Sequence, residues 1–171
     1  MENINYYPEG YLLDTQENQS AIQSPSGLAE AMREGRILEA RAIICDSTHN
    51  LIVDLHGIKG IIPREEGAVG IREGTVRDIA MISRVNRPVS FVVTELLRDE
   101  KGVTTAILSR RKAQERCMEE YLSKLCPGDV IPARITHLEP FGAFADIGCG
   151  VVSLLPIDSI SVSRIDHPRE R

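Results

Sequence analysis

The sequence repeats itself at a nearly constant offset, and no other feature constrains the fold as much. Ala40-Arg41 recurs as Ala133-Arg134, and Ile61-Ile62-Pro63 recurs as Leu154-Leu155-Pro156, both 93 residues further on. Between these pairs, Val53-Asp54-Leu55 recurs as Ala145-Asp146-Ile147, 92 residues further on. A fixed period of this kind indicates two copies of one structural unit.

The first copy is predicted to form a small closed barrel over residues 36–110. Short apolar runs separated by turn residues predict five strands: ILEARAIIC, LIVDL, IKGIIP, PVSFVVTELL and VTTAILS. A longer glycine-containing stretch, residues 64–87, lies between the third and fourth runs and contains a predicted short helix around Val76 to Ile82. Five strands with such an excursion are typical of a Greek-key barrel of the OB type.

The flanks of this barrel are predicted to be less regular or helical. Residues 1–25 mix Asn, Gln, Ser, Pro and acids without a period, so we expect a disordered tail. Residues 26–35 predict a short helix that ends at Gly35. Residues 111–126, free of Gly and Pro and closed by Pro127-Gly128, predict a linker helix.

The second copy, residues 127–171, has room for three strands only. Its counterparts of the fourth and fifth strands would lie beyond Arg171, the last residue of the sequence. We therefore expect the chain to be a fragment of a longer polypeptide. We also expect the open sheet either to be ordered by packing on the linker helix or to be completed by strand pairing with another chain.

Composition and charge exclude several classes of protein. No run approaches the roughly 18 apolar residues of a membrane span, and no signal peptide is visible, so we expect a cytoplasmic protein without membrane contact. The four cysteines form no Cys-x-x-Cys pair, which favours reduced thiols over a zinc site. The net charge is −5, and only residues 36–116 are basic, at +3. Binding to nucleic acid through clustered cations alone is therefore disfavoured.

One motif in the second copy resembles a known family. Gly128-Asp129 opens its first strand, and Phe141-Gly142-Ala143-Phe144 with Ala145-Asp146 follows on its second. This pattern resembles the S1 RNA-binding domain, specifically over residues 127–171 and more weakly over residues 36–112. The whole chain resembles the N-terminal part of a bacterial ribosomal protein S1 homologue. The implied fold is all-β: a degenerate S1-type OB barrel, a linker helix and the first three strands of a second S1 barrel.

Phe141 and Phe144 are the leading candidates for contact with RNA. A regular strand points residues three apart to opposite faces, but a bulge at Gly142 would let both rings lie outside. Exposed rings can stack on any base and contribute roughly 1–3 kcal/mol per base, so binding would need no positive net charge. The alternative is that both rings fill the barrel core.

Cationic side chains complete the candidate site. Arg134 would face outward beside the rings, with Ala133 and Ile135 inward. Further candidates for contacts with bases or phosphates are His137, Arg164, His167 and Arg169. The family often carries a histidine after its third strand, where this chain has Pro156. In the first copy, His49-Asn50-Leu51-Ile52 replace the aromatic motif, so that copy is predicted to dock on protein rather than to bind RNA.

These observations predict a non-catalytic protein of translation that binds single-stranded RNA or mRNA and associates with the small ribosomal subunit. No nucleophile and base, convergent metal ligands or glycine-rich phosphate loop can be found in the sequence, so we expect no enzyme activity, cofactor or metal. Two alternatives stay open. The chain could be a protein-docking scaffold, or the accessory S1 region of a larger RNA-processing or other enzyme.

Overall fold

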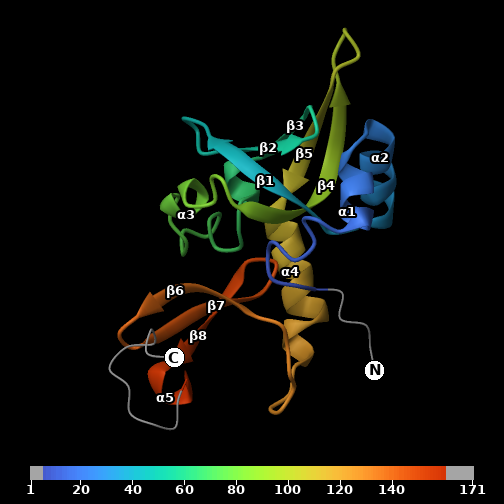
Figure 1. The fold of residues 1–171 in the computed structure, drawn as a ribbon. Coiled ribbons are helices and arrows are strands. Elements are labelled where there is room, and N and C mark those ends of the chain that lie inside the picture. Colours follow the sequence, from blue (N-terminus) through green and yellow to red (C-terminus); the bar gives the residue numbers. More distant parts are fainter. Residues whose placement is uncertain (1–5, 161–171) are drawn as a thin grey trace.

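The computed structural model describes residues 6–160. They form a closed five-stranded barrel, a helix that leads away from it, and a three-stranded sheet beside that helix (Figure 1). The barrel strands follow each other in space in the order β1-β2-β3-β5-β4, with β3 and β5 parallel and the other neighbours antiparallel. Their bounds are β1 Leu38–Cys45, β2 Leu51–Leu55, β3 Ile58–Ile62, β4 Pro88–Arg98 and β5 Thr104–Ser109. The predicted OB-type barrel is confirmed.

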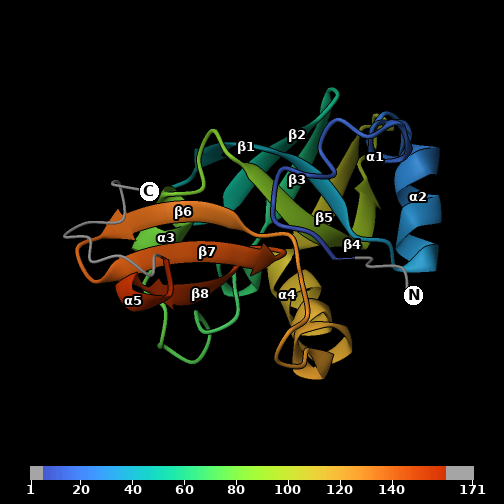
Figure 2. The ribbon, with the colours of Figure 1, turned by 60° about the horizontal axis from the view of Figure 1, so that its bottom comes forward.

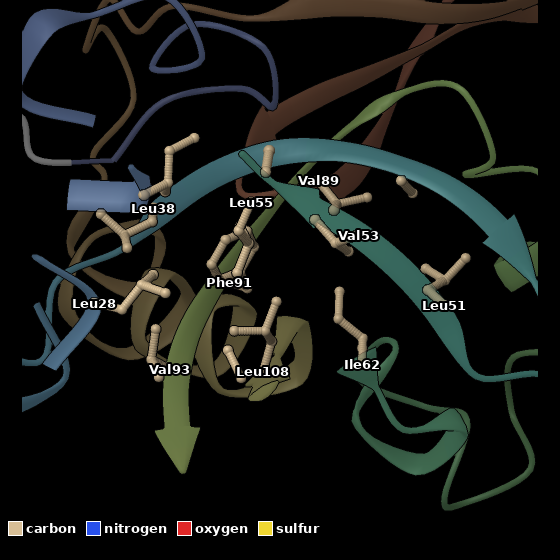
Figure 3. Packing of buried hydrophobic residues seen from close by; sticks show 14 of the residues in the cluster. Leu28, Leu38, Leu51, Val53, Leu55, Ile62, Val89, Phe91, Val93 and Leu108 are labelled. Atoms are coloured by element: carbon tan, nitrogen blue, oxygen red, sulfur yellow. The ribbon is translucent and has the colours of Figure 1, made fainter. Parts of the chain in front are cut away.

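The barrel closes around an apolar core because alternate strand residues point inward. In β2, Leu51, Val53 and Leu55 are fully buried, whereas the intervening Asp54 is exposed. Phe91 of β4 lies at the centre of the barrel, as Figure 3 shows, among side chains contributed by every strand. Between β3 and β4 the chain forms a 3-10 turn, η1 (Arg64–Glu66), and a short helix, α3 (Ile79–Ile82).

Two helices cover one end of the barrel, where the sequence predicted only one. Helix α2 (Pro25–Glu34) starts from the Ser24 cap, whose side chain accepts a hydrogen bond from the Gly27 amide, and ends at Gly35 in the left-handed region, at φ 65°. Helix α1 (Gln16–Ile22) precedes it and buries Ala21 and Ile22 against the same core. The predicted tail is therefore wrong for residues 6–25, because a few apolar residues in a polar stretch pack against the barrel.

Helix α4 (Arg110–Glu120) connects the barrel to the second sheet. It ends earlier than the predicted 111–126, because Tyr121 leaves the helical region and a 3-10 turn, η2 (Leu122–Lys124), follows. Ala113 and Cys117 of this helix are fully buried with Tyr6 and Cys149. This second apolar cluster fixes the helix against both the N-terminal segment and the second sheet.

The second sheet has the order β6-β7-β8. Its strands are β6 (Arg134–Glu139), β7 (Gly142–Gly148) and β8 (Val151–Pro156), and a short helix, α5 (Ile157–Ile160), follows. The predicted three-strand copy is confirmed, but it encloses no barrel core. Ile135, expected to face inward, is 52% exposed, and Ala133 is exposed as well.

The segment 6–12, here called the N-terminal strap, lies between the barrel and the turn that joins β7 to β8 (dark blue in Figures 1 and 2). Glu9 is the buried centre of the strap. Its carboxylate accepts hydrogen bonds from Nε and Nη2 of Arg110, at 2.9 and 2.6 Å, and from the Ser90 amide at 2.7 Å. Its own amide donates to the Asp146 carboxylate at 2.8 Å. One residue thus joins the barrel, α4 and the second sheet.

Charge balance keeps Glu9 ionised inside the protein. Burial alone would raise the pKa of its carboxyl, but the charge and hydrogen bonds of Arg110, together with the Ser90 amide and Arg84, outweigh burial and hold the pKa below its usual range. Without these partners, desolvation of the charged carboxylate at this position would strongly destabilise the folded state.

Replacing Glu9 by Ala is expected to lower the free energy of unfolding by about 3–5 kcal/mol, because it leaves the buried Arg110 charge unpaired. Denaturant unfolding followed by circular dichroism measures this change. The double variant Glu9→Leu with Arg110→Met should lose less unfolding free energy than Glu9→Ala, since it leaves no unpaired charge in the interior. Glu17→Ala, at an exposed site on α1, is the control, and an equal effect of both single variants would contradict the role given to the strap.

A second buried carboxyl, Glu39 of β1, holds the other end of the strap. Its two oxygens accept hydrogen bonds from the amides of Gly10 and Leu12, at 2.5 and 3.0 Å. Burial, with the nearby charges of Glu9 and Asp146, raises the pKa of Glu39 to about 7 despite these two bonds.

This raised pKa predicts a stability that depends on pH. The folded state binds the Glu39 proton more tightly than the unfolded chain, so its contribution is complete below pH 4.5, the usual pKa, and is lost as the pH rises through about 7. The loss is expected to be on the order of 3 kcal/mol. Unfolding free energies measured across this range should show a weaker dependence on pH in Glu39→Gln than in the parent or in Glu30→Gln, an exposed control. Parallel profiles for all three proteins would refute the assignment.

Across residues 6–160, no helix combines the length and the apolar character that crossing a bilayer requires.

Candidate nucleic-acid interface

Three rings lie together on one face of the second sheet. Phe144 of β7 stacks on His137 of β6, with ring centres 6.3 Å apart and planes at 26°. Phe141 meets Phe144 edge to face, with centres 6.2 Å apart. Phe141 is 54% exposed and Phe144 half-buried, so the alternative of two core phenylalanines is wrong for the described sheet.

The rings reach one face by a different route from the predicted one. Phe141 lies in the two-residue turn before β7, where its carbonyl accepts a hydrogen bond from the Ile157 amide at 2.9 Å. The bulge is on β6, between Ile135 and His137, and not at Gly142. The extra residue, Thr136, places His137 directly opposite Phe144, and opposite residues of an antiparallel pair share a face.

Gly142 has another physical role. Its φ lies outside the left-handed region, but a Cβ at this position would meet the Leu155 carbonyl oxygen at 2.4 Å. The absent side chain therefore lets β8 approach β7 next to the rings. Because Leu154 of β8 pairs with Phe144, its exposed side chain extends the same face. We call His137, Phe141, Phe144 and Leu154 the ring face.

The ring face has few polar groups, and two of them, an imidazole and a carboxylate, form a close pair. His137 Nε2 lies 2.5 Å from the Glu139 carboxylate, and both side chains are solvent-accessible. The Glu139 carboxylate therefore occupies the ring nitrogen of His137 that a ligand phosphate would otherwise contact. The ring face can therefore contribute stacking more readily than attraction to phosphate.

Arg134 is not part of the ring cluster. Its Nη1 donates a hydrogen bond to the Glu9 carbonyl at 3.0 Å, which draws the guanidinium over Gly10 of the strap. The other cationic candidates, Arg164, His167 and Arg169, lie outside the described residues. Of the predicted site residues, the structure brings together Phe141, Phe144 and His137.

Asp146, which follows the aromatic motif and corresponds to Asp54 of the first copy, is buried beneath the strap. One carboxylate oxygen accepts from the Gly148 and Gly150 amides, at 2.9 and 3.0 Å, and the other from the Glu9 amide. Burial raises the pKa of this carboxyl, and the Glu9 charge adds to the effect. The flanking glycines, which can form the tight turn that points amides at the carboxylate, are the only local signal for this role.

The corresponding place in the barrel carries a polar cluster. His49 adopts a positive φ of 65°, and its Nδ1 lies 2.6 Å from the Asp78 carboxylate. Arg64 pairs with the same carboxylate, and the hydrogen bonds from Arg64 and His49 hold the pKa of Asp78 at about 2. Leu51, in a motif position, is buried in the core. This place therefore offers charges and no stacked ring pair.

A closed OB-type barrel followed by a partial second copy with an exposed aromatic hairpin resembles the arrangement of S1-like proteins. The comparison with known proteins agrees, although no family model matches the chain. The chain is 32% identical to small ribosomal subunit protein bS1 of Leuconostoc lactis over 80% of its own length and 30% of the relative's. It is 30% identical to bS1 of Rhodopseudomonas palustris over 69% of the chain and 20% of the relative. The same protein of Mycobacterium tuberculosis is 28% identical over 84% of the chain and 28% of the relative.

The chain thus resembles part of bS1 and spans less than a third of the length of these curated relatives.

Proposed function

We propose that the chain is a non-catalytic, single-stranded RNA-binding protein of translation and that its ring face holds the RNA. The observation that carries this proposal is the cluster of His137, Phe144 and Phe141 on an accessible sheet face. Three neighbouring rings with an aliphatic side chain beside them make a platform for unpaired bases, because every base has a π-face. The similarity to small ribosomal subunit proteins supports the same proposal.

The charges predict the character of this binding. With a net charge of −5 and Glu139 at the rings, phosphate attraction is weak, so stacking has to supply most of the affinity. We therefore expect modest affinity, little sequence preference at the ring face and a shallow dependence on salt.

Phe144→Ala is expected to weaken binding of a single-stranded RNA oligomer about tenfold, because it removes the central stacking surface of roughly 1–3 kcal/mol. Fluorescence anisotropy titrations at low and moderate salt measure the dissociation constants. Tyr11→Ala is the matched control, since it removes a 48% exposed ring on the strap. Unchanged affinity in Phe144→Ala would count decisively against the ring face.

The barrel supports a second candidate function, docking on a protein of the small ribosomal subunit. Several exposed apolar side chains belong to β1 and α3: Ile43, Ile44, Ile79 and Ile82. Of these, Ile43, Ile44 and Ile82 line a groove on the barrel. The exposed fractions of all four side chains lie between 43% and 64%. Contiguous apolar surface of this kind is typical of protein contact sites.

The double variant Ile44→Glu with Ile82→Glu is expected to reduce co-sedimentation with purified small ribosomal subunits at least about fivefold, because it places two charges in an apolar contact. Val103→Glu, at a 58% exposed site near the tip of the β4–β5 hairpin, is the control. The same double variant should leave RNA binding at the ring face unchanged. Equal co-sedimentation of the parent, the double variant and Val103→Glu would refute the docking proposal and would not affect the proposal of RNA binding.

Self-association of the second sheet also stays a proposal. Its edge strands β6 and β8 and its exposed Ile135 and Leu155 could pair with a second copy, and light scattering across a concentration series would measure this.

A further inference from the structure

A cavity of about 410 Å³ lies between the barrel and the second sheet. One side of its wall comes from residues around η1 and α3, the opposite side comes from β6, β7 and β8, and α4 contributes the rest. Figure 2 shows these strands beside α3. Aliphatic side chains line most of it: Val69, Val76, Ala80, Met118, Val151 and Val152. Its size and mostly apolar lining with a few polar groups are typical of small-molecule sites.

The cavity opens on the same sheet face as the rings. Asp146 and Val152, which line it, form the cross-strand pair next to Phe144 and Leu154. The two pairs are two residues apart along each strand, or about 7 Å, and therefore lie on one face of the sheet. A strand of RNA stacked on Phe144 would reach the cavity at an adjoining position.

Most polar groups of the cavity already have partners. Arg110 is held by Glu9 and by the Gly67 carbonyl, and Gln114 by the Val69 amide and the Cys149 carbonyl. Asp146 accepts three backbone amides. These groups form the wall and offer few free donors or acceptors to a ligand.

Arg84 is the exception. Within the described residues its guanidinium makes no hydrogen bond, and its one ion-pair contact is Glu9 Oε1 at 3.8 Å. Its side chain is 22% exposed and lines the cavity. Five N–H donors in a planar fork are thus available beside apolar walls.

The charges around the cavity indicate what kind of group would enter. Arg84 and Arg110 are positive, while Glu9 and Asp146 are negative, so the cavity has no net charge to attract a phosphate. A flat, uncharged group with apolar faces and a polar edge fits better. A nucleobase has this shape, and guanine presents the two adjacent acceptors, O6 and N7, that an arginine fork binds bidentately.

We propose that this cavity is a second subsite of the RNA path and that it takes one unstacked base, guanine in preference to uracil, whose acceptor edge meets Arg84. The inference rests on the proposed function, because the base must belong to a strand held at the ring face. It adds a base preference that the rings alone do not provide.

The test uses ten-nucleotide oligouridine and a series in which one guanosine replaces uridine at each position in turn. Anisotropy titrations with the full chain should show a gain in affinity of about five- to tenfold for at least one position of guanosine, since a bidentate pair with arginine distinguishes guanine from the other bases. Arg84→Met should abolish this gain and leave oligouridine binding within about twofold. Arg84→Lys should also lose the gain, although it keeps the charge.

Two further variants control for charge and folding. Arg87→Met removes a charge from an exposed neighbouring site and should keep the gain from guanosine. Ala80→Leu reduces the cavity from the α3 side without removing a charge and should abolish the gain. Thermal unfolding of each variant shows whether the fold is kept.

The outcomes separate the two proposals. If oligouridine binds and depends on Phe144, but guanosine brings no gain or Arg84→Met and Ala80→Leu both retain it, the second subsite is wrong and the proposed function stands. If no oligomer binds, or if Phe144→Ala changes nothing, the proposed function fails and the subsite fails with it.

Discussion

The carboxylate of Glu9 and the guanidinium of Arg110 meet in a buried ion pair, and the relative placement of the two structural units depends on it. The pair unites residues that are 101 positions apart in the chain, and the Glu9 amide reaches Asp146 beyond them. Burying two charges is costly, and a well-packed apolar pair of the same size would often be as stable. The hydrogen bonds between these charged and amide groups, however, form only in a narrow range of geometries. The pair therefore specifies how the strap, α4 and the second sheet fit together rather than simply adding stability.

The candidate RNA site gains its geometry from this arrangement. A three-stranded sheet with an exposed inner face has too small a core to hold its rings rigidly by itself. Here, Cys149 at the β7–β8 turn is packed against Cys117 of α4, and the Cys149 amide donates to the Tyr7 carbonyl at 2.9 Å. These contacts already order the sheet before a ligand binds. The entropic cost of binding is therefore smaller, and more of the stacking energy appears as affinity. The same contacts also create the wall of the cavity between the units.

Local sequence patterns were sufficient for the barrel and insufficient for what joins it to the second sheet. Strand alternation and turn residues act within a few positions, and the repeat extends the pattern of the first copy to the second, so β1 to β8 could be located from them. The strap could not, because its ordering comes from Glu9 and Glu39, two acids that are buried only through partners far away in the chain. The same limit applies to Arg134, which looked free in a strand pattern but bonds to the Glu9 carbonyl. The aromatic motif located the ring face, whereas its geometry depends on a bulge in the neighbouring strand that no residue of the motif reveals.

That bulge has a consequence for how such a surface could arise. With His137 deleted and the flanking pairs Ile135–Ala145 and Leu138–Ala143 kept, Thr136 would fall opposite Phe144, and the strand would need no bulge. Insertion of a single codon in an ancestral hairpin would thus have been enough to recruit a third ring beside two existing ones. New recognition surfaces on small β-structures can emerge in one genetic step, because a bulge takes up the inserted length and the neighbouring pairs keep their register.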